Sequence, residues 1–172
     1  MSVNGNEKDV LFYEVLKEIC MNSKIIESEE YIQHGNTSVF MHSIAVAYYS
    51  HSIALIFKLP VDERKLIRGA LLHDYFLYDW HKKDIKHPLH GIRHPYIALQ
   101  NANRDLRLSN IEKDIILKHM FPLTLIPPRY LESVIVCIID KACSVYETFY
   151  LNLIFNLYDI KLKKVALCKA NQ

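Results

Sequence analysis

The chain has 172 residues, a length that suits one domain, and with 51% hydrophobic and 11% aromatic residues it can form a sizeable core. A formal net charge of +2 gives no reason to expect a nucleic-acid partner. Only 4 glycines are present, which favours helices over a turn-rich β fold.

The first half of the chain has the pattern of successive helices with short breaks. Helices are expected over residues 6–21, 29–34, 38–58 and 61–73. The sequence Gly-Asn-Thr-Ser at 35–38 supplies a turn and an N-cap for the third helix, and Pro60 ends it. Asp62 is the expected N-cap of the fourth helix.

The second half begins with an irregular stretch, residues 75–93, which we interpret as a long loop of the kind that is usually functional. Asp79, Trp80 and His81 in this loop would form either a lid over a substrate or a plain surface loop. Helices are then expected over 95–103, 109–120 and 130–158, with Pro95 in a first turn and Ser109 starting a capping box. One domain is predicted over 1–172, with its core at about 36–146 and a solvated basic tail at 159–172 that includes Lys161, Lys163, Lys164 and Lys169.

Three features indicate a cytoplasmic protein without a membrane partner. The cysteines, Cys20, Cys137, Cys143 and Cys168, contain no CxxC pair, so we expect reduced and mostly buried thiols. The N-terminus is polar, unlike a secretory signal. The most apolar stretch, 134–157, carries Asp140, Lys141 and Glu147, which favours a buried helix over a transmembrane one.

A His-Asp dipeptide at 73–74 is weak evidence by itself, because about half an occurrence is expected by chance. Its setting carries more information. Leu66, Gly69 and Ala70 precede His73 by one or two helical turns, so His73 lies on an apolar face. A buried carboxylate needs a partner, and a cation beside imidazoles would provide one.

The same test selects four further polar residues on apolar helical faces: His42, His94, His119 and Asp140. An unpaired Asp140 within the run VIVCIIDKACSV would cost several kcal/mol. His90 competes with His94 as a ligand, and Pro95 favours His94 by placing it at a helix start. Nitrogen and carboxylate ligands without thiolate suit iron, manganese, cobalt, nickel or zinc.

The order His42, His73-Asp74, His94, His119, Asp140 resembles the HD superfamily of metal-dependent phosphohydrolases over about residues 36–146. The fragments SVFMHSIAVAYYS, GALLHDYFLYDWH, HGIRHPYIA, KHMFPLT and VCIIDKACS all carry this likeness. In the simplest family form, His42, His73, Asp74 and Asp140 would hold one metal. In the two-metal form, His94 and His119 are added and Asp74 bridges. The layout is similar to bacterial diadenosine tetraphosphate hydrolases and to HD-GYP phosphodiesterases, whose glycine-tyrosine-proline signature is missing here.

The resemblance implies an all-α, single-domain helical bundle that binds two divalent transition metals, iron first, with manganese, nickel, cobalt or zinc as alternatives. It implies hydrolysis of a phosphoester or phosphoanhydride in a small phosphorylated substrate, a nucleotide being expected, by a metal-activated hydroxide. Asp74 is the expected catalytic residue, and Lys141 and then Arg93 are the first candidates for a basic residue that contacts the phosphate. Lys118 and Arg68 are weaker candidates for that contact.

Two alternatives stay open at this stage. The same ligand order resembles the mixed-valence di-iron oxygenases related to myo-inositol oxygenase, which bind O₂ instead of activating water. A non-catalytic domain that binds a nucleotide and keeps its metal as a structural staple is the other. The histidines not expected to be ligands are His34, His51, His81 and His87.

Overall fold

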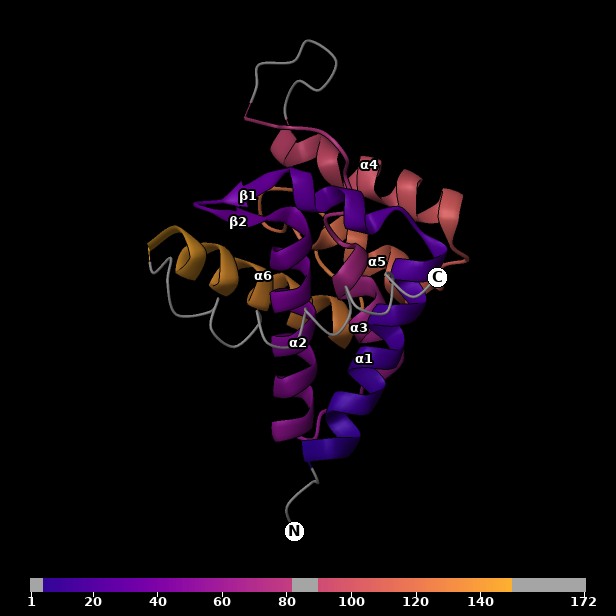
Figure 1. The fold of residues 1–172 in the computed structure, drawn as a ribbon. Coiled ribbons are helices and arrows are strands. Elements are labelled where there is room, and N and C mark those ends of the chain that lie inside the picture. Colours follow the sequence, from indigo (N-terminus) through magenta and orange to yellow (C-terminus); the bar gives the residue numbers. More distant parts are fainter. Residues whose placement is uncertain (1–4, 82–89, 150–172) are drawn as a thin grey trace.

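The computed structural model describes residues 5–81 and 90–149. The helices in order are α1 (Gly5–Asn22), the 3₁₀ helix η1 (Ile25–Glu30), α2 (Val39–Ile56), α3 (Glu63–Leu72), α4 (His90–Asp105), α5 (Asn110–Lys118) and α6 (Leu131–Phe149). A two-stranded antiparallel hairpin, β1 (Ile32–His34) and β2 (Thr37–Ser38), precedes α2 (Figure 1). The prediction of an all-α fold is confirmed. The basic tail, Cys168, His87 and part of the loop expected at 75–93 lie outside the described residues.

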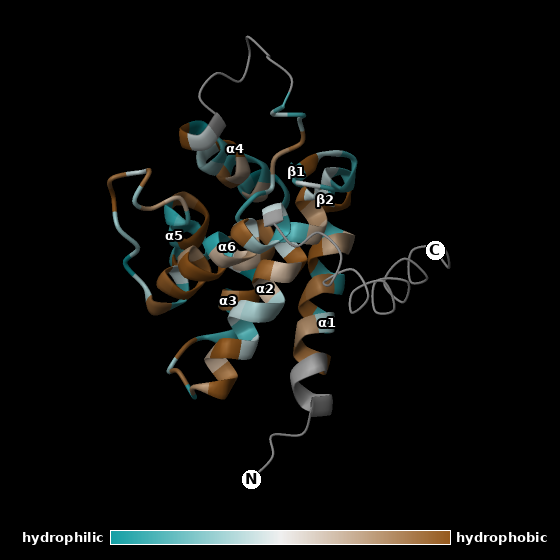
Figure 2. Ribbon diagram, turned by 90° about the vertical axis from the view of Figure 1, so that its left-hand side faces the viewer, coloured by the Kyte–Doolittle hydropathy of each residue, from teal (hydrophilic) through white to brown (hydrophobic). Residues whose placement is uncertain are grey.

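The core forms where α2, α3, α5 and α6 pack against one another, with α1 against α3 and α4 against α5. In the view of Figure 2, α2 lies between α1 and α3. It is long and apolar enough to cross a membrane, but 67% of this stretch is buried within the fold, as in the core helix of a bundle. Because α2 is buried on several sides, His42, near its N-terminal end, lies in the interior of the bundle.

Side-chain caps define the starts of α2, α3 and α5, as the sequence predicts. The hydroxyl of Ser38 accepts from the backbone N–H of Met41 at the start of α2, and the Asp62 carboxylate accepts from Lys65 at the start of α3. Ser109 and Glu112 form a reciprocal capping box at the start of α5. These caps fix the register of each helix relative to the residues that it carries into the core.

The helices α3 and α5 cross at close range because α3 has a glycine at the contact. A Cβ atom at Gly69 would collide with the side chain of Ile115, which is fully buried. The close crossing brings the C-terminal ends of these two helices together. His73 follows α3 and His119 follows α5 as their C-caps, so the crossing also brings two histidines together.

Two expectations about local structure are wrong. The helix expected at 29–34 is replaced by η1 and the β1–β2 hairpin. At the turn of the hairpin Gly35 has a φ of 56°, a backbone conformation that residues with a Cβ atom adopt only with strain. Helix α4 starts at His90, so Pro95 lies inside it instead of in the first turn. The proline removes only the hydrogen bond to the carbonyl of Gly91, close to the helix start, and this limited loss explains why the helix continues through it.

Candidate metal centre

Six side chains from five separate parts of the chain meet inside the bundle. They are His42 on α2, His73 and Asp74 after α3, His94 on α4, His119 after α5 and Asp140 on α6, and none is more than 6% exposed. These are the six residues that the sequence singles out as metal ligands. The structure therefore brings together residues that lie up to about a hundred positions apart in the chain.

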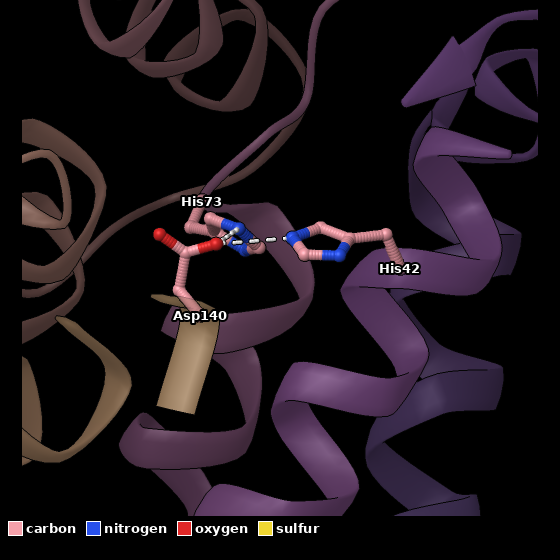
Figure 3. Close-up of side chains that lie close together, drawn as sticks. All are labelled: His42, His73 and Asp140. Carbon is pink, nitrogen blue, oxygen red and sulfur yellow. Dashed lines mark hydrogen bonds and ion pairs between the residues drawn. The ribbon is translucent and has the colours of Figure 1, made fainter. Parts of the chain in front are cut away.

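The first group of donor atoms comprises His42, His73 and Asp140. The Oδ1 atom of Asp140 lies 3.0 Å from Nε2 of His42 and 3.7 Å from Nε2 of His73. Figure 3 shows the two rings, from α2 and from the end of α3, directed at the Asp140 carboxylate. One donor atom from each of the three residues lies within 4.8 Å of the others, close enough for a shared metal ion.

The second group is built around Asp74, with His73 and His119 within the same 4.8 Å limit. Its Oδ1 atom lies 3.1 Å from Nε2 of His94 and 3.4 Å from Nε2 of His119. Its Oδ2 atom lies 3.3 Å from Nε2 of His73 and 3.9 Å from Nε2 of His42. The two oxygens of one carboxylate thus face two different pairs of imidazoles.

Helix ends orient two of these imidazoles. The last carbonyls of a helix have no partner within the helix. The Nδ1–H group of His73 donates to the carbonyl of Ala70 at 2.7 Å, and that of His119 donates to the carbonyl of Ile116 at 2.8 Å. A carbonyl only accepts, so each ring carries a proton on Nδ1 and its Nε2 atom faces the centre.

The donor set fits a divalent cation. The Nε2 atom of His73 and the Oδ1 atom of Asp74 are buried. Each has a neighbour at 3.1–3.3 Å, but neither makes a hydrogen bond of acceptable geometry among the residues that the structure describes. A buried polar atom left in this state costs about 1–3 kcal/mol. A metal ion bound to both atoms would remove that cost, and imidazole and carboxylate donors suit iron, manganese, cobalt, nickel or zinc.

The electrostatics of the centre favour a positive charge between the carboxylates. Burial raises the pKa of both Asp74 and Asp140, but their histidine neighbours outweigh it and hold both pKa values well below the usual range. Burial would lower the pKa of His42, yet Asp140 and a second carboxylate, Glu147, raise it to about 9. For His119, burial prevails and lowers the pKa. A metal cation would supply the charge that protonated imidazoles otherwise provide.

Three residues at the centre were not predicted. The amide Nε2 of Gln33 donates to Oδ2 of Asp74 at 2.6 Å, and a carboxylate oxygen of Glu147 lies 2.8 Å from Nδ1 of His42. His34, expected not to be a ligand, packs its ring edge-on against His42 at 5.5 Å between centroids. Glu147 had a sequence signal, since it follows Asp140 by two helical turns on one face of α6. Gln33 and His34 have none, because the sequence pattern around them predicts a helix where the structure has the β1–β2 hairpin.

The candidate basic residues lie in different surroundings. The ammonium group of Lys141 donates to the carbonyls of His119 at 2.7 Å and Cys137 at 3.1 Å and lies in the wall of a cavity at the centre. Arg93 is exposed on α4 and, among the described residues, is not one that lines this cavity. Lys118 pairs with Asp114 at 2.7 Å, and Arg68 pairs with Glu18 and Glu112, so both are engaged elsewhere.

The remaining described histidines differ in burial and in the groups that they contact. His51 is buried on α2 and bonds Glu63 at 2.8 Å, away from the centre, as its spacing from His42 predicts. His81 lies beside Asp79 with 47% of its side chain exposed. His94 occupies the position for which His90 competed in the sequence, and the side chain of His90 lies outside the described residues.

A cavity of about 670 Å³ opens onto the centre. Its described walls combine site residues with apolar and polar groups: Gln33, His34, Asp74, Trp80, Gly91, His94, His119, Met120, Pro122, Leu123, Asp140, Lys141 and Ser144. This volume is within the range of pockets that hold small-molecule ligands. Four of the six converging residues, Asp74, His94, His119 and Asp140, thus form part of the wall of a cavity large enough for a small molecule.

Comparison with known proteins agrees with this geometry. The chain matches the HD domain family over residues 39–143, a span that contains all six converging residues. No curated protein and no solved structure matches the chain. Since the family match covers more than half of the 172 residues, the chain belongs to the HD domain family, a superfamily of metal-dependent phosphohydrolases whose members bind divalent metals.

Proposed function

We propose that this protein hydrolyses a phosphoester or phosphoanhydride bond in a small phosphorylated molecule, and that the molecule is a nucleotide. One observation carries the proposal: buried imidazole and carboxylate atoms, two of them without a hydrogen-bond partner in the described part of the chain, converge on a cavity of about 670 Å³. Such a donor set in an HD domain suits a metal-dependent hydrolase better than a purely structural core.

The residues divide into two ligand groups in this proposal. His42, His73 and Asp140 would hold one ion, and His94 and His119 would hold a second, with Asp74 shared because its two oxygens face different imidazoles. Iron is the first choice, and manganese, nickel, cobalt and zinc are alternatives. Bound cations would supply Lewis acidity at the phosphate and lower the pKa of water.

The protein's own groups have separate tasks. Lys141 is held by two backbone carbonyls in the cavity wall, so its positive charge has a fixed position from which it can attract a phosphate. The Trp80 ring lies in the same wall and packs against His81 at 3.9 Å between ring centroids, and a nucleobase would extend this stack. Arg93, exposed at the start of α4, would approach a phosphate only from the rim. These features support a nucleotide over a small phosphoester that has no aromatic base.

The proposal is tested by assaying metal-loaded protein against a panel of phosphorylated compounds. The panel contains bis-(p-nitrophenyl) phosphate, nucleoside mono- and triphosphates and diadenosine tetraphosphate, each with manganese, iron, cobalt, nickel or zinc. We expect metal-dependent release of product from at least one nucleotide, and loss of both metal and activity in Asp74→Ala. Normal hydrolysis by Asp74→Ala, or silence of the whole panel with fully loaded protein, would refute it.

A di-iron oxygenase would behave differently in one respect. Iron-loaded protein would then consume O₂, whereas a hydrolase works with manganese in the absence of oxygen. Anaerobic turnover of a nucleotide by the manganese form therefore supports hydrolysis. Oxygen uptake coupled to substrate loss, without anaerobic turnover, would replace this proposal by the oxidative one.

A further inference from the structure

Glu147 is a buried acidic residue next to the candidate metal centre, and its carboxylate contacts His42. It lies on α6, two turns beyond Asp140, and is 4% exposed. Its Oε2 atom lies 2.8 Å from Nδ1 of His42, on the side of the ring opposite to Asp140. Glu147 lies outside the residues that match the HD domain family, which end at 143.

The position of His42 in its helix explains why it needs such a partner. His73 and His119 follow the last residues of their helices, where free backbone carbonyls accept their Nδ1 protons. His42 lies inside α2, where the carbonyl groups accept backbone N–H groups from the next turn. A group from another helix must therefore accept the Nδ1 proton of His42, and α6 supplies Glu147.

We propose that Glu147 is a positioning residue that holds His42 with its proton on Nδ1 and the Nε2 lone pair directed at the metal position beside Asp140. An imidazole that coordinates through Nε2 must carry its proton on Nδ1, and an ionised carboxylate can only accept that proton's hydrogen bond. Carboxylate partners of this kind orient metal-binding histidines and increase their basicity. The inference rests on the metal site of the proposed function.

The substitution Glu147→Gln separates positioning from packing. Glutamine has nearly the same volume, but its amide can donate as well as accept. In Glu147→Gln the amide can donate to Nδ1 of His42, which leaves the ring proton on Nε2, where it bonds Asp140 and blocks the metal. A purely structural Glu147 would tolerate this exchange, because glutamine has nearly the same shape and keeps one hydrogen bond to His42.

The chain offers a matched control on the same helix. His51 is also fully buried on α2, and its Nε2 atom also lies 2.8 Å from a glutamate oxygen, that of Glu63, whose side chain is 42% exposed; neither residue lines the cavity. Glu63→Gln therefore reports what the exchange of a histidine's glutamate partner does outside the cavity. The measured quantity is the affinity for Mn²⁺ alone, from free Mn²⁺ by electron paramagnetic resonance, with the melting temperature of each variant.

We expect Glu147→Gln to bind Mn²⁺ about 10- to 100-fold more weakly than wild type, and Glu63→Gln to bind it equally well. In zinc-loaded wild-type protein, nitrogen-15 spectra should show the His42 proton on Nδ1. A folded Glu147→Gln variant that binds Mn²⁺ as tightly as wild type would overturn the inference. If that variant does not fold, the wild-type spectrum decides, and a proton on Nε2 of His42 would overturn it.

These outcomes are independent of turnover. Wild-type protein that binds Mn²⁺ but hydrolyses no phosphate compound would contradict the proposed function and leave the role of Glu147 intact. Wild-type protein that hydrolyses its substrate, together with undiminished Mn²⁺ affinity in Glu147→Gln, would contradict the role of Glu147 alone.

Discussion

The close crossing of α3 and α5 predicts that Gly69→Ala lowers the stability of the protein, whereas the same substitution in an ordinary helix raises it. In a helix interior, alanine is favoured over glycine by about 1 kcal/mol. Here, however, the new Cβ would collide with Ile115, and even after its outer methyl moves, Cβ and Cγ1 of Ile115 lie at 3.1 and 3.3 Å. Ile115 is fully buried and cannot withdraw, so overpacking of about 1–3 kcal/mol outweighs the gain.

The magnitude follows from a double-mutant cycle. We expect Gly69→Ala to lower the free energy of unfolding by about 1 kcal/mol in wild type, the difference between overpacking and helix propensity. In an Ile115→Ala background, itself destabilised by about 2–5 kcal/mol, the colliding Cδ1 and Cγ1 atoms are absent and only the contact with Cβ at 3.1 Å remains. Gly69→Ala should then stabilise by up to about 1 kcal/mol. The coupling energy is then up to about 2 kcal/mol.

Urea denaturation followed by circular dichroism measures each corner of this cycle. The reasoning is refuted if Gly69→Ala stabilises both backgrounds by the same amount. That result would mean that α3 and α5 do not cross in contact at Gly69, and that the close placement of His73 and His119 has another origin.

Three further predictions concern the centre and its scaffold. Mn²⁺ at about one hundred times its dissociation constant should add about 2.7 kcal/mol to the stability of wild type. A chelator should remove this added stability. If the melting temperature of Asp74→Asn responds to Mn²⁺ as much as that of wild type, Asp74 is not a ligand. Gln33→Leu deletes the hydrogen bond to Oδ2 of Asp74, so it should cost about 1.5–3 kcal/mol and weaken Mn²⁺ binding; unchanged binding by calorimetry would show that Asp74 needs no such support. Ser109→Ala removes the cap of α5 and should cost about 1 kcal/mol with the same Mn²⁺ affinity as wild type, which separates loss of stability from loss of the site; an altered affinity would contradict this separation.

The sequence predicts the converging residues because each breaks an apolar helical pattern. Asp140 lies within a run of apolar residues on α6, and His42 lies on the buried face of α2. A polar group in such a place needs a partner, and in a helical bundle the partner must come from another helix. The structure brings these residues together at distances of 3–4 Å, although their role as ligands stays a prediction.

The features that the sequence does not predict depend on backbone geometry that leaves no periodic pattern in the sequence. The β1–β2 hairpin is short, and its conformation depends on a single glycine with positive φ, so the placement of Gln33 and His34 could not be inferred. The start of α4 was misjudged because Pro95 usually marks a first turn and here lies inside the helix. Glu147 shares a helical face with Asp140, but only the position of α2 explains which group it contacts.

The most direct test of the central claim is a crystal structure of metal-loaded protein with anomalous diffraction measured on both sides of the metal's absorption edge. We expect an anomalous peak bonded to Nε2 of His73 and to the carboxylate of Asp74, two groups at the centre that each have a buried atom without a hydrogen-bond partner in the described part of the chain. Stoichiometrically loaded protein whose anomalous peaks all lie away from His42, His73, Asp74 and Asp140 would contradict it.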